Sequence, residues 1–539
     1  MLMPRTKPSV KPASYTIRYL LLLFIFTAAY SIAGAQVGQR LRIYNSWDEV
    51  KLYNNDTIAH TVWKPVIYTD SLVREDRSQP WLKRKFFQEH LLQVQNKDIN
   101  IYGDIVIDEY VGKSNRYAKM VGAKNINVKT PSVDTRGFEV SGNIGSKIYF
   151  ETNFYENQGK FGGYIDSFIR QYKVIPGQAS YKNIGDGSGF DFSSSSARVT
   201  YIPNKTLLFD LGYGKNFIGD GYRSLLMSDW SVNYPYFRVA LTFGKFQYSA
   251  MWSQYVSHVD GTLDNHAGFY RKWAQTYVLD WNAAPGFNIS LFESVIWPDQ
   301  LHGPDRQKDI SASLLSPVIF LHGSKSPSGV SNNDILGLNA KLKVYERSYL
   351  YGQFVVNQFG SGWKNRTGFQ LGVRSGDVFE LRGLNVDAEF NTVRPYTYAG
   401  SSPDVSYSNA DQGLAHPLGA NFREGIVTAT YTYKKWWLRG ELFVASYGVD
   451  TGQSNYGHNI FALLPSQSPV TGSVSNGQGV STNLVYLDLR AAYIINPLSN
   501  LRLETGITYR RETNSLSNFK DLIFYIGIRT TFRSLLYDF

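Results

Sequence analysis

The chain has 539 residues, of which 15% are aromatic and 18% are charged, with 55 Lys and Arg against 44 Asp and Glu. It has no cysteine, which excludes disulfides, thiolate metal sites and cysteine nucleophiles. Lysine and arginine are scattered without a basic run or an RNA-binding motif, so we expect no nucleic-acid partner. Many aromatic residues with few charges are typical of a protein that has one lipid-facing and one watery surface.

Residues 1–35 have the organisation of a secretory signal peptide. Basic residues from Arg5 to Arg18 precede an apolar run that begins at Tyr19, and Ala33-Gly34-Ala35 supplies the small residues required before cleavage. The mature protein is therefore expected to be exported. No later segment offers the roughly 20 apolar residues of a membrane-spanning helix, so a membrane protein of this sequence must be a closed barrel.

Residues 36–97 do not have the pattern of a barrel, and we predict a small, partly helical N-terminal periplasmic or plug segment. Within it, residues 61–69 predict a short strand. Residues 79–95 predict a helix, because their apolar side chains gather on one helical face. We interpret His90 as a surface or packing histidine, since no partner lies at the spacing of metal ligands.

Residues 98–539 predict an antiparallel barrel. Residues 138–144 and 148–154 alternate between apolar and polar side chains around a tight turn, which predicts a β-hairpin. With this one, eight short turns are predicted, and longer connections separate them, as in outer-membrane barrels. With a first strand near residues 99–110 and a last near 522–532, the count is about 18. The prediction is an all-β transmembrane barrel in the bacterial outer membrane.

Charged residues occupy inward-facing positions of four predicted strands. If the apolar residues face lipid, acids and bases alternate within the lumen. We interpret them as ion pairs that tie the lumen together, with a water-filled pore as the alternative; general acid–base catalysis is disfavoured because no substrate position is defined. These residues are Asp387, Glu389, Arg439, Glu441, Asp488, Arg490, Arg502, Glu504 and Arg510.

Residues 212–229 interrupt the strand pattern. Residues 207–213 alternate as a strand, after which Gly219-Asp220-Gly221 suits a tight turn and residues 223–229 suit one helical turn. A folded insertion at a strand end is a common position for function. The alternative is that the two glycines and the acid form only a turn.

The segment 214–226, GKNFIGDGYRSLL, followed by Pro235, resembles the signature of the Wzi-like capsule-assembly barrels, especially the branch that includes the gliding-motility protein RemB. The resemblance implies an outer-membrane barrel of eighteen strands with helical elements that close its periplasmic end. It also implies a lectin that binds surface or capsular polysaccharide and helps hold it on the cell. Supporting matches are Arg136-Gly137-Phe138, Tyr155-Glu156-Asn157-Gln158, Leu350-Tyr351-Gly352-Gln353-Phe354, Arg394-Pro395-Tyr396-Thr397-Tyr398, His416-Pro417-Leu418-Gly419-Ala420-Asn421-Phe422 and Tyr537-Asp538-Phe539.

Outer loops that contain the signature are expected to contact the sugar, which needs aromatic faces and polar groups that bind hydroxyls. The candidate ligand-binding residues are Lys215, Asn216, Asp220, Tyr222, Arg223, Asp229 and Trp230. Further aromatic candidates, part of which we expect to serve as membrane anchors or loop packing, are Trp297, Trp363, Tyr396, Tyr398, Tyr407 and Tyr456. We interpret His416 as a residue that orders its loop.

Three functions remain open: non-enzymatic polysaccharide binding, which we favour, a porin-like channel, and an outer-membrane anchor of gliding or secretion machinery. An enzyme is not expected, because no GxSxG, HExxH, P-loop or dinucleotide fingerprint is present. We expect no metal and no cofactor. The expected partners are outer-membrane lipid, the polysaccharide and the barrel-assembly machinery, whose recognition signal the aromatic end at Phe539 resembles.

Overall fold

The computed structural model describes residues 39–44, 60–71, 80–115, 130–178, 180–185, 187–257, 271–298, 319, 332–359, 364–452, 454–465, 474–533 and 535–539. The predicted signal peptide, residues 1–35, and the aromatic candidate Trp363 lie outside these residues.

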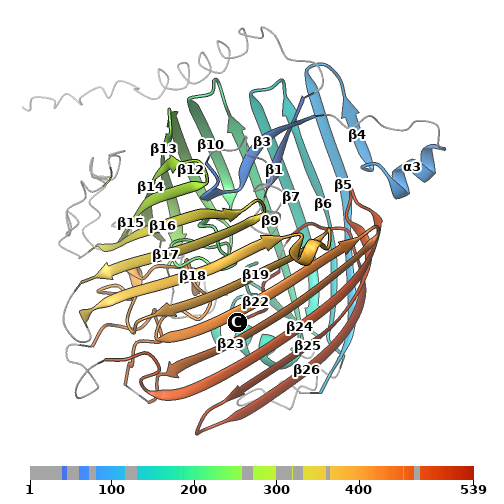
Figure 1. Cartoon of the computed structure of the whole chain (residues 1–539). Coiled ribbons are helices and arrows are strands. Elements are labelled where there is room, and N and C mark those ends of the chain that lie inside the picture. The colour runs from blue at the N-terminus through green and yellow to red at the C-terminus, as the bar shows by residue number, and fades with distance from the viewer. Residues whose placement is uncertain are drawn as a thin grey trace, which may run out of the picture.

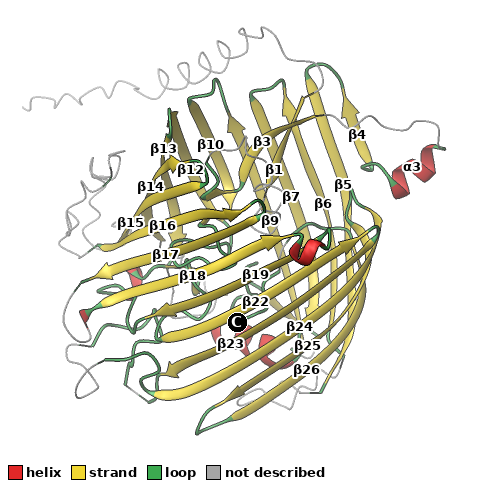
Figure 2. Ribbon diagram, viewed as in Figure 1, coloured by secondary structure: helices red, strands yellow, loops and turns green. Residues whose placement is uncertain are grey.

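An 18-strand antiparallel sheet closes into one barrel (Figures 1 and 2). Long strands that follow one another in the chain pair with each other, and β26 pairs with β5 to close the ring. The barrel confirms the predicted fold class and the bacterial outer-membrane location. The strands are β5 (Ile99–Ser114), β6 (Ser132–Ile144), β7 (Ile148–Lys160), β9 (Gly189–Tyr201), β10 (Leu207–Gly214), β12 (Tyr234–Phe243), β13 (Phe246–Val256), β14 (Arg271–Ala284), β15 (Phe287–Pro298), β16 (Asn333–Tyr345), β17 (Ser348–Gln358), β18 (Arg366–Gly376), β19 (Leu384–Val393), β22 (Phe422–Tyr433), β23 (Trp436–Val449), β24 (Val480–Asn496), β25 (Leu501–Thr513) and β26 (Asn518–Arg529).

Short turns gather at one end of the barrel and most long connections at the other. Residues 145–147 join β6 to β7 and residues 434–435 join β22 to β23, whereas residues 394–421 join β19 to β22. Outer-membrane barrels place short turns in the periplasm, which identifies the periplasmic end here. β5 begins and β26 ends at this same end.

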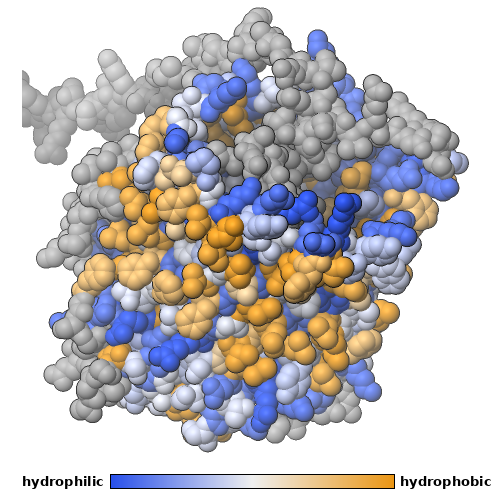
Figure 3. Space-filling view, viewed as in Figure 1, coloured by the Kyte–Doolittle hydropathy of each residue, from blue (hydrophilic) through white to orange (hydrophobic). Residues whose placement is uncertain are grey.

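The strands alternate between a lipid face and a luminal face. On β23, Leu438 and Leu442 are 42% and 43% exposed, whereas Glu441 and Phe443 between and after them are buried. Side chains of a strand point alternately to its two faces, so this pattern gives an apolar outside and a mixed, partly charged inside. Figure 3 shows apolar residues gathered across the outer surface of the barrel.

The predicted helix over residues 79–95 is wrong in its extent. Helix α3 (Trp81–Phe87) is followed by strand β4 (Leu92–Gln95), which pairs with β5. The reason is an open edge: β26 pairs with β5 only from Glu109 to Ser114, and β4 fills part of the edge that β26 leaves free. Backbone pairing to a free strand edge outweighs the helical pattern of these residues.

The remaining short elements cover or fill the barrel. Strands β1 and β3 pair with each other, β2 pairs with β11, β8 pairs with β9, and β20 pairs with β21. No helix among the described residues is long and apolar enough to cross a membrane. These elements are β1 (Gln39–Tyr44), β2 (Trp63–Lys64), β3 (Val66–Ser71), α4 (Gly163–Tyr172), β8 (Lys182–Ile184), β11 (Phe217–Ile218), η4 (Val378–Glu380), η5 (Pro403–Val405), β20 (Ser408–Asn409) and β21 (Gln412–Gly413).

Candidate functional site in the barrel lumen

Residues 215–233, which we call the inner segment, connect β10 to β12 and fold into the lumen. Their short strand β11 pairs with β2, so that Phe217 lies opposite Lys64 and Ile218 opposite Trp63. The indole of Trp63 also donates to Asn216 Oδ1 at 3.0 Å. The signature is therefore an internal structure braced by the N-terminal part of the chain, which differs from the expectation of an exposed outer loop.

The acidic turn of the inner segment is fixed to strand β16. Asp220 accepts a hydrogen bond of 2.7 Å from Asn339 and lies 3.1 Å from the ammonium of Lys341. Burial raises the pKa of Asp220, but Lys341 and Lys64 outweigh it and bring that pKa down to about 2. This carboxylate stays ionised, and the lysine charges beside it compensate its own. Its role is therefore structural.

The glycines that flank this acid are required by close approach. A Cβ atom on Gly219, which has a φ of 148°, would lie 2.3 Å from Nε2 of Gln353. A Cβ atom on Gly221 would lie 2.4 Å from a carboxylate oxygen of Glu389. The backbone bends at this motif, and the glycines let it approach two barrel strands closely.

Tyr222 and Arg223 connect the inner segment to the last residues of the chain. Glu389 accepts both of their backbone N–H groups, at 2.9 and 3.2 Å. The Arg223 guanidinium lies 3.0 Å from the carboxylate of Asp538 and 3.7 Å from that of Glu424. The Tyr222 hydroxyl donates to Asp538 at 2.7 Å. These contacts keep residues 223–229 from forming the predicted helical turn, which is absent.

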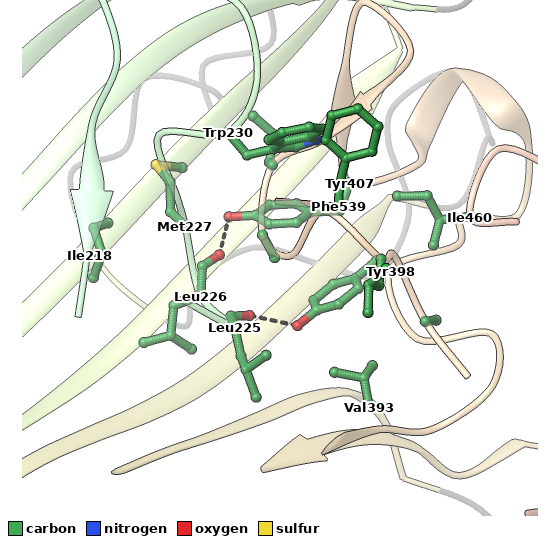
Figure 4. Close-up of a cluster of buried hydrophobic side chains, with 14 of the residues drawn as sticks. Ile218, Leu225, Leu226, Met227, Trp230, Val393, Tyr398, Tyr407, Ile460 and Phe539 are labelled. Atoms are coloured by element: carbon green, nitrogen blue, oxygen red, sulfur yellow. Dashed lines mark hydrogen bonds between the residues drawn. The ribbon is translucent and has the colours of Figure 1, made fainter. Parts of the chain in front are cut away.

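An aromatic and aliphatic cluster follows in the inner segment (Figure 4). Leu225 and Leu226 are fully buried, and their carbonyls accept 2.7 Å hydrogen bonds from the hydroxyls of Tyr398 and Tyr407. Trp230 is 2% exposed. The cluster has the burial of a protein core although it lies inside a barrel.

Residues 530–533 and 535–539 follow the last strand and turn into the lumen. The last strand, predicted near residues 522–532, ends at Arg529. The ring of Phe539 packs 5.1 Å from that of Trp230 and 4.6 Å from that of Phe168 of α4. Arg510 donates to the Phe539 carbonyl at 3.0 Å. The physical reason is that the cluster offers Phe539 a buried pocket that the lipid face does not.

The predicted luminal charges face inward and form ion pairs. Most pairs join residues two apart on one strand: Arg439 with Glu441 at 3.0 Å, Arg490 with Asp488 at 2.5 Å and Arg502 with Glu504 at 2.6 Å. Asp387 pairs with Arg374 on the neighbouring strand. Glu389 instead holds the inner segment, as described above.

The loop aromatics are less accessible than expected. Trp297, Tyr396, Tyr398 and Tyr407 are all at most 4% exposed, so they offer no open ring face to a sugar, and only Tyr456 is half-buried. They are buried because the connection of residues 394–421 folds inward with the inner segment. The ring of His416 is likewise buried and lies 2.7 Å from Glu424, and its Nδ1 accepts the backbone N–H of Leu418, which fits a loop-ordering role.

A cavity of about 490 Å³ lies beside the inner segment, along the wall of β5, β6, β7 and β9. Three of the candidate residues line it: Lys215, Asn216 and Asp229. It extends to the periplasmic end, where Pro497 and Leu498 of the β24–β25 turn border it. The barrel strands that line the cavity across from the inner segment contribute Glu139, Glu151, Arg198, Tyr149, Tyr155 and Tyr236.

The polar groups of this cavity are arranged in hydrogen-bonded pairs with tyrosines. Tyr155 donates to Glu139 at 2.6 Å, and Tyr149 donates to Glu151 at 3.0 Å. On the facing side, Lys215 donates to the Asp229 carbonyl at 2.9 Å, and burial lowers the pKa of this lysine to about 8 despite the opposing charge of Asp229. Rings beside carboxylates, amides and a cation are the groups that sugar recognition uses.

Sequence reasoning missed the tyrosines and glutamates of β6 and β7. Their inward positions follow from the same alternation that predicted the strands, so the signal that they face the lumen was present. Nothing local distinguishes an inward residue at a cavity from one against a plug. Among the described residues, no group of three or more His, Cys, Asp or Glu side chains is placed to hold a metal ion.

Solved outer-membrane barrels resemble this chain in fold. Wzi from Escherichia coli, described as an outer-membrane protein involved in group 1 capsule assembly and a carbohydrate-binding β-barrel, has 14% identity and a TM-score of 0.46 over 78% of this chain and 84% of that chain. OprD from Pseudomonas aeruginosa has 9% identity and a TM-score of 0.41 over 82% and 98%. OccAB2 from Acinetobacter baumannii has 10% identity and a TM-score of 0.41 over 81% and 98%. No protein-family model and no curated protein matches the chain.

Proposed function

We propose that this outer-membrane barrel is a non-enzymatic protein that binds surface or capsular polysaccharide and helps assemble or retain it at the cell surface. The observation that carries the proposal is the 490 Å³ cavity, in which tyrosines, carboxylates and a lysine surround open space. Its volume falls within the range of about 300–1,000 Å³ that is usual for small-ligand sites. The likeness of residues 214–226 to the Wzi-like signature supports the same assignment.

The ligand-binding residues divide by position under this proposal. Lys215, Asn216 and Asp229 face the cavity and are assigned to the sugar. Asp220 and Arg223 are assigned to the scaffold, because their charges are already paired within the protein. The cavity can take one segment of a polymer rather than a whole chain.

The test is the partition of surface polysaccharide between cells and medium in a strain that lacks the gene, with total polysaccharide measured alongside. Retention predicts an unchanged total and a shift of material into the medium, restored by the wild-type gene and not by Lys215→Gln. A control complementation with Lys173→Gln, an exposed lysine at the end of α4, should restore retention. If neither total nor partition changes on deletion, the proposal is wrong.

A porin-like channel is the second candidate, and the extent of the same cavity to the periplasmic end favours it. The packed cluster of Figure 4 opposes it, because buried apolar side chains fill part of the lumen. Single-channel recording of the purified barrel in planar bilayers separates the two. Steady conductance would support the channel, and its absence would support the binding protein.

The resemblance to the branch that contains RemB supports a third candidate, an outer-membrane anchor for gliding or secretion partners. In this case the barrel would anchor partner proteins to the outer membrane, and these proteins would contact its loops. Chemical crosslinking in intact cells, followed by identification of the attached proteins, tests it. Recovery of the same envelope proteins through several loop positions would favour the anchor.

A further inference from the structure

Helix α3 and strand β4 form an apolar element at the periplasmic edge of the barrel, where β4 pairs with β5; we call it the rim element (Figure 1). None of the seven residues of α3 is buried. Trp81, Leu82 and Phe86 are 58%, 72% and 56% exposed, and β4 adds Leu92 at 52% and Val94 at 42%. Large apolar side chains this densely exposed are unusual on a surface that faces water.

The rim element is fixed to the barrel through its polar groups. Asn496, at the periplasmic end of β24, donates to the carbonyls of Lys85 and Glu89 at 3.2 and 2.9 Å. The buried Glu89 carboxylate in turn pairs with Arg84 at 2.5 Å and with Lys85 at 3.0 Å. Because these polar groups are directed at the barrel and at each other, the apolar side chains are left to face outward.

The rim element continues the lipid-facing surface of the barrel. Beside it, Trp436 and Tyr493 pack edge to face at 5.2 Å on the outer wall, and Trp436 is 54% exposed. The Lys435 ammonium lies 5.8 Å from the centre of the Phe87 ring and 5.9 Å from that of Tyr493. Exposed aromatic rings with adjacent lysines mark the level of the headgroups in membrane proteins.

We propose that the rim element lies in the periplasmic leaflet of the outer membrane and binds glycerophospholipid there as an interfacial anchor. Its apolar side chains reach the boundary of the acyl chains, while the exposed amines of Lys83, Lys434 and Lys435 meet the phosphates. Continuity with the lipid face selects a bilayer as the occupant over a second copy of the chain or a periplasmic protein. The inference concerns the periplasmic rim and is independent of the proposed polysaccharide site.

The absence of cysteine makes a direct test possible. Leu82→Cys is labelled with an environment-sensitive fluorophore in the full-length chain and reconstituted in vesicles of phosphatidylethanolamine and phosphatidylglycerol. Leu503→Cys, 52% exposed on the lipid face of β25, is the membrane control. Lys205→Cys, exposed on the β9–β10 turn, is the aqueous control. Heat-modifiable migration on gels confirms that each variant forms the barrel.

The proposal predicts that the label at residue 82 is quenched by nitroxide lipids, loses quenching by aqueous iodide and shifts its emission to the blue, as the label at residue 503 does. A label at residue 82 that behaves like the label at residue 205 would overturn it. Protection from both quenchers would also overturn it, because that result means that protein covers the element.

Discussion

The two walls of the lumen use the same residue types in opposite ways. On the wall of β16 to β23, Lys341 and Glu389 are bonded directly to the inner segment. On the wall of β6 and β7, Glu139 and Glu151 are bonded to tyrosines on their own side and face open space. Buried charged groups that bond to a segment across the lumen stabilise the structure. Charged groups that bond only within their own wall and face open space can form a binding site.

The largest effect on stability is expected where the wall of β16 to β23 is bonded to the inner segment. Arg223→Met removes the cation that faces Asp538 and Glu424 and leaves their charges buried without it, which should lower the free energy of unfolding by about 3–5 kcal/mol. Denaturant titration in detergent micelles, followed by heat-modifiable migration, measures the loss. The double variant Arg223→Met/Asp538→Asn should recover part of it, since one uncompensated charge is removed. An unchanged single variant would mean that Arg223 does not compensate the buried charges of Asp538 and Glu424.

The packed cluster should be nearly as sensitive. Trp230→Ala removes a side chain that is 2% exposed and contacts the ring of Phe539, so we expect a loss of about 3–5 kcal/mol. Trp436→Ala, on the lipid face, is the matched control and should change the free energy of unfolding far less in the same titration. Equal losses in the two variants would contradict a luminal core.

The acidic turn predicts a pH dependence of stability. Because the pKa of Asp220 is lowered from 3.8 to about 2 in the folded protein, its stabilisation is fully present above pH 3.8 and is lost as the pH falls through 2. The contribution is roughly 2 kcal/mol. The difference in the free energy of unfolding between wild type and Asp220→Asn should therefore shrink by about this amount over the interval. Parallel unfolding curves from pH 5 to pH 2 would show instead that the ion pair with Lys341 contributes nothing.

The smallest effect on stability is expected beside the cavity. Lys215→Met removes an amine whose ionisation burial disfavours, so stability at pH 7 should change by less than about 0.5 kcal/mol or rise. Binding of purified surface polysaccharide, measured by calorimetry, should weaken in the same variant. A fall in stability with unchanged binding would move Lys215 from the site to the scaffold.

The strands of the barrel could be predicted from the sequence because their signal is local. Alternation located the β6–β7 hairpin and the start of β5 at Ile99, and turn residues fixed the strand number. The destination of the inner segment could not be predicted, since Asp220 bonds to Asn339 and the carbonyl of Ile218 bonds to Gln353, each more than a hundred positions away. No local pattern distinguishes a connection that turns inward from one that stays outside.

The positions of the rim element and of residues 535–539 could not be predicted for a related reason. Residues 92–95 carry a helical pattern, but the strand that they form depends on how far β26 extends along β5. The aromatic end at Phe539 is visible in the sequence, but its position depends on a pocket made by Trp230 and α4. In the first case a free strand edge, and in the second a buried pocket, is formed by distant residues and decides the local structure.

The contact of Arg223 with residue 538 also orders events in time. It joins positions 315 apart in the chain, and contacts of such long sequence separation form slowly because a large loop must close first. Completion of the luminal core is therefore a late step in folding. A complete core implies that the barrel strands around it have already formed.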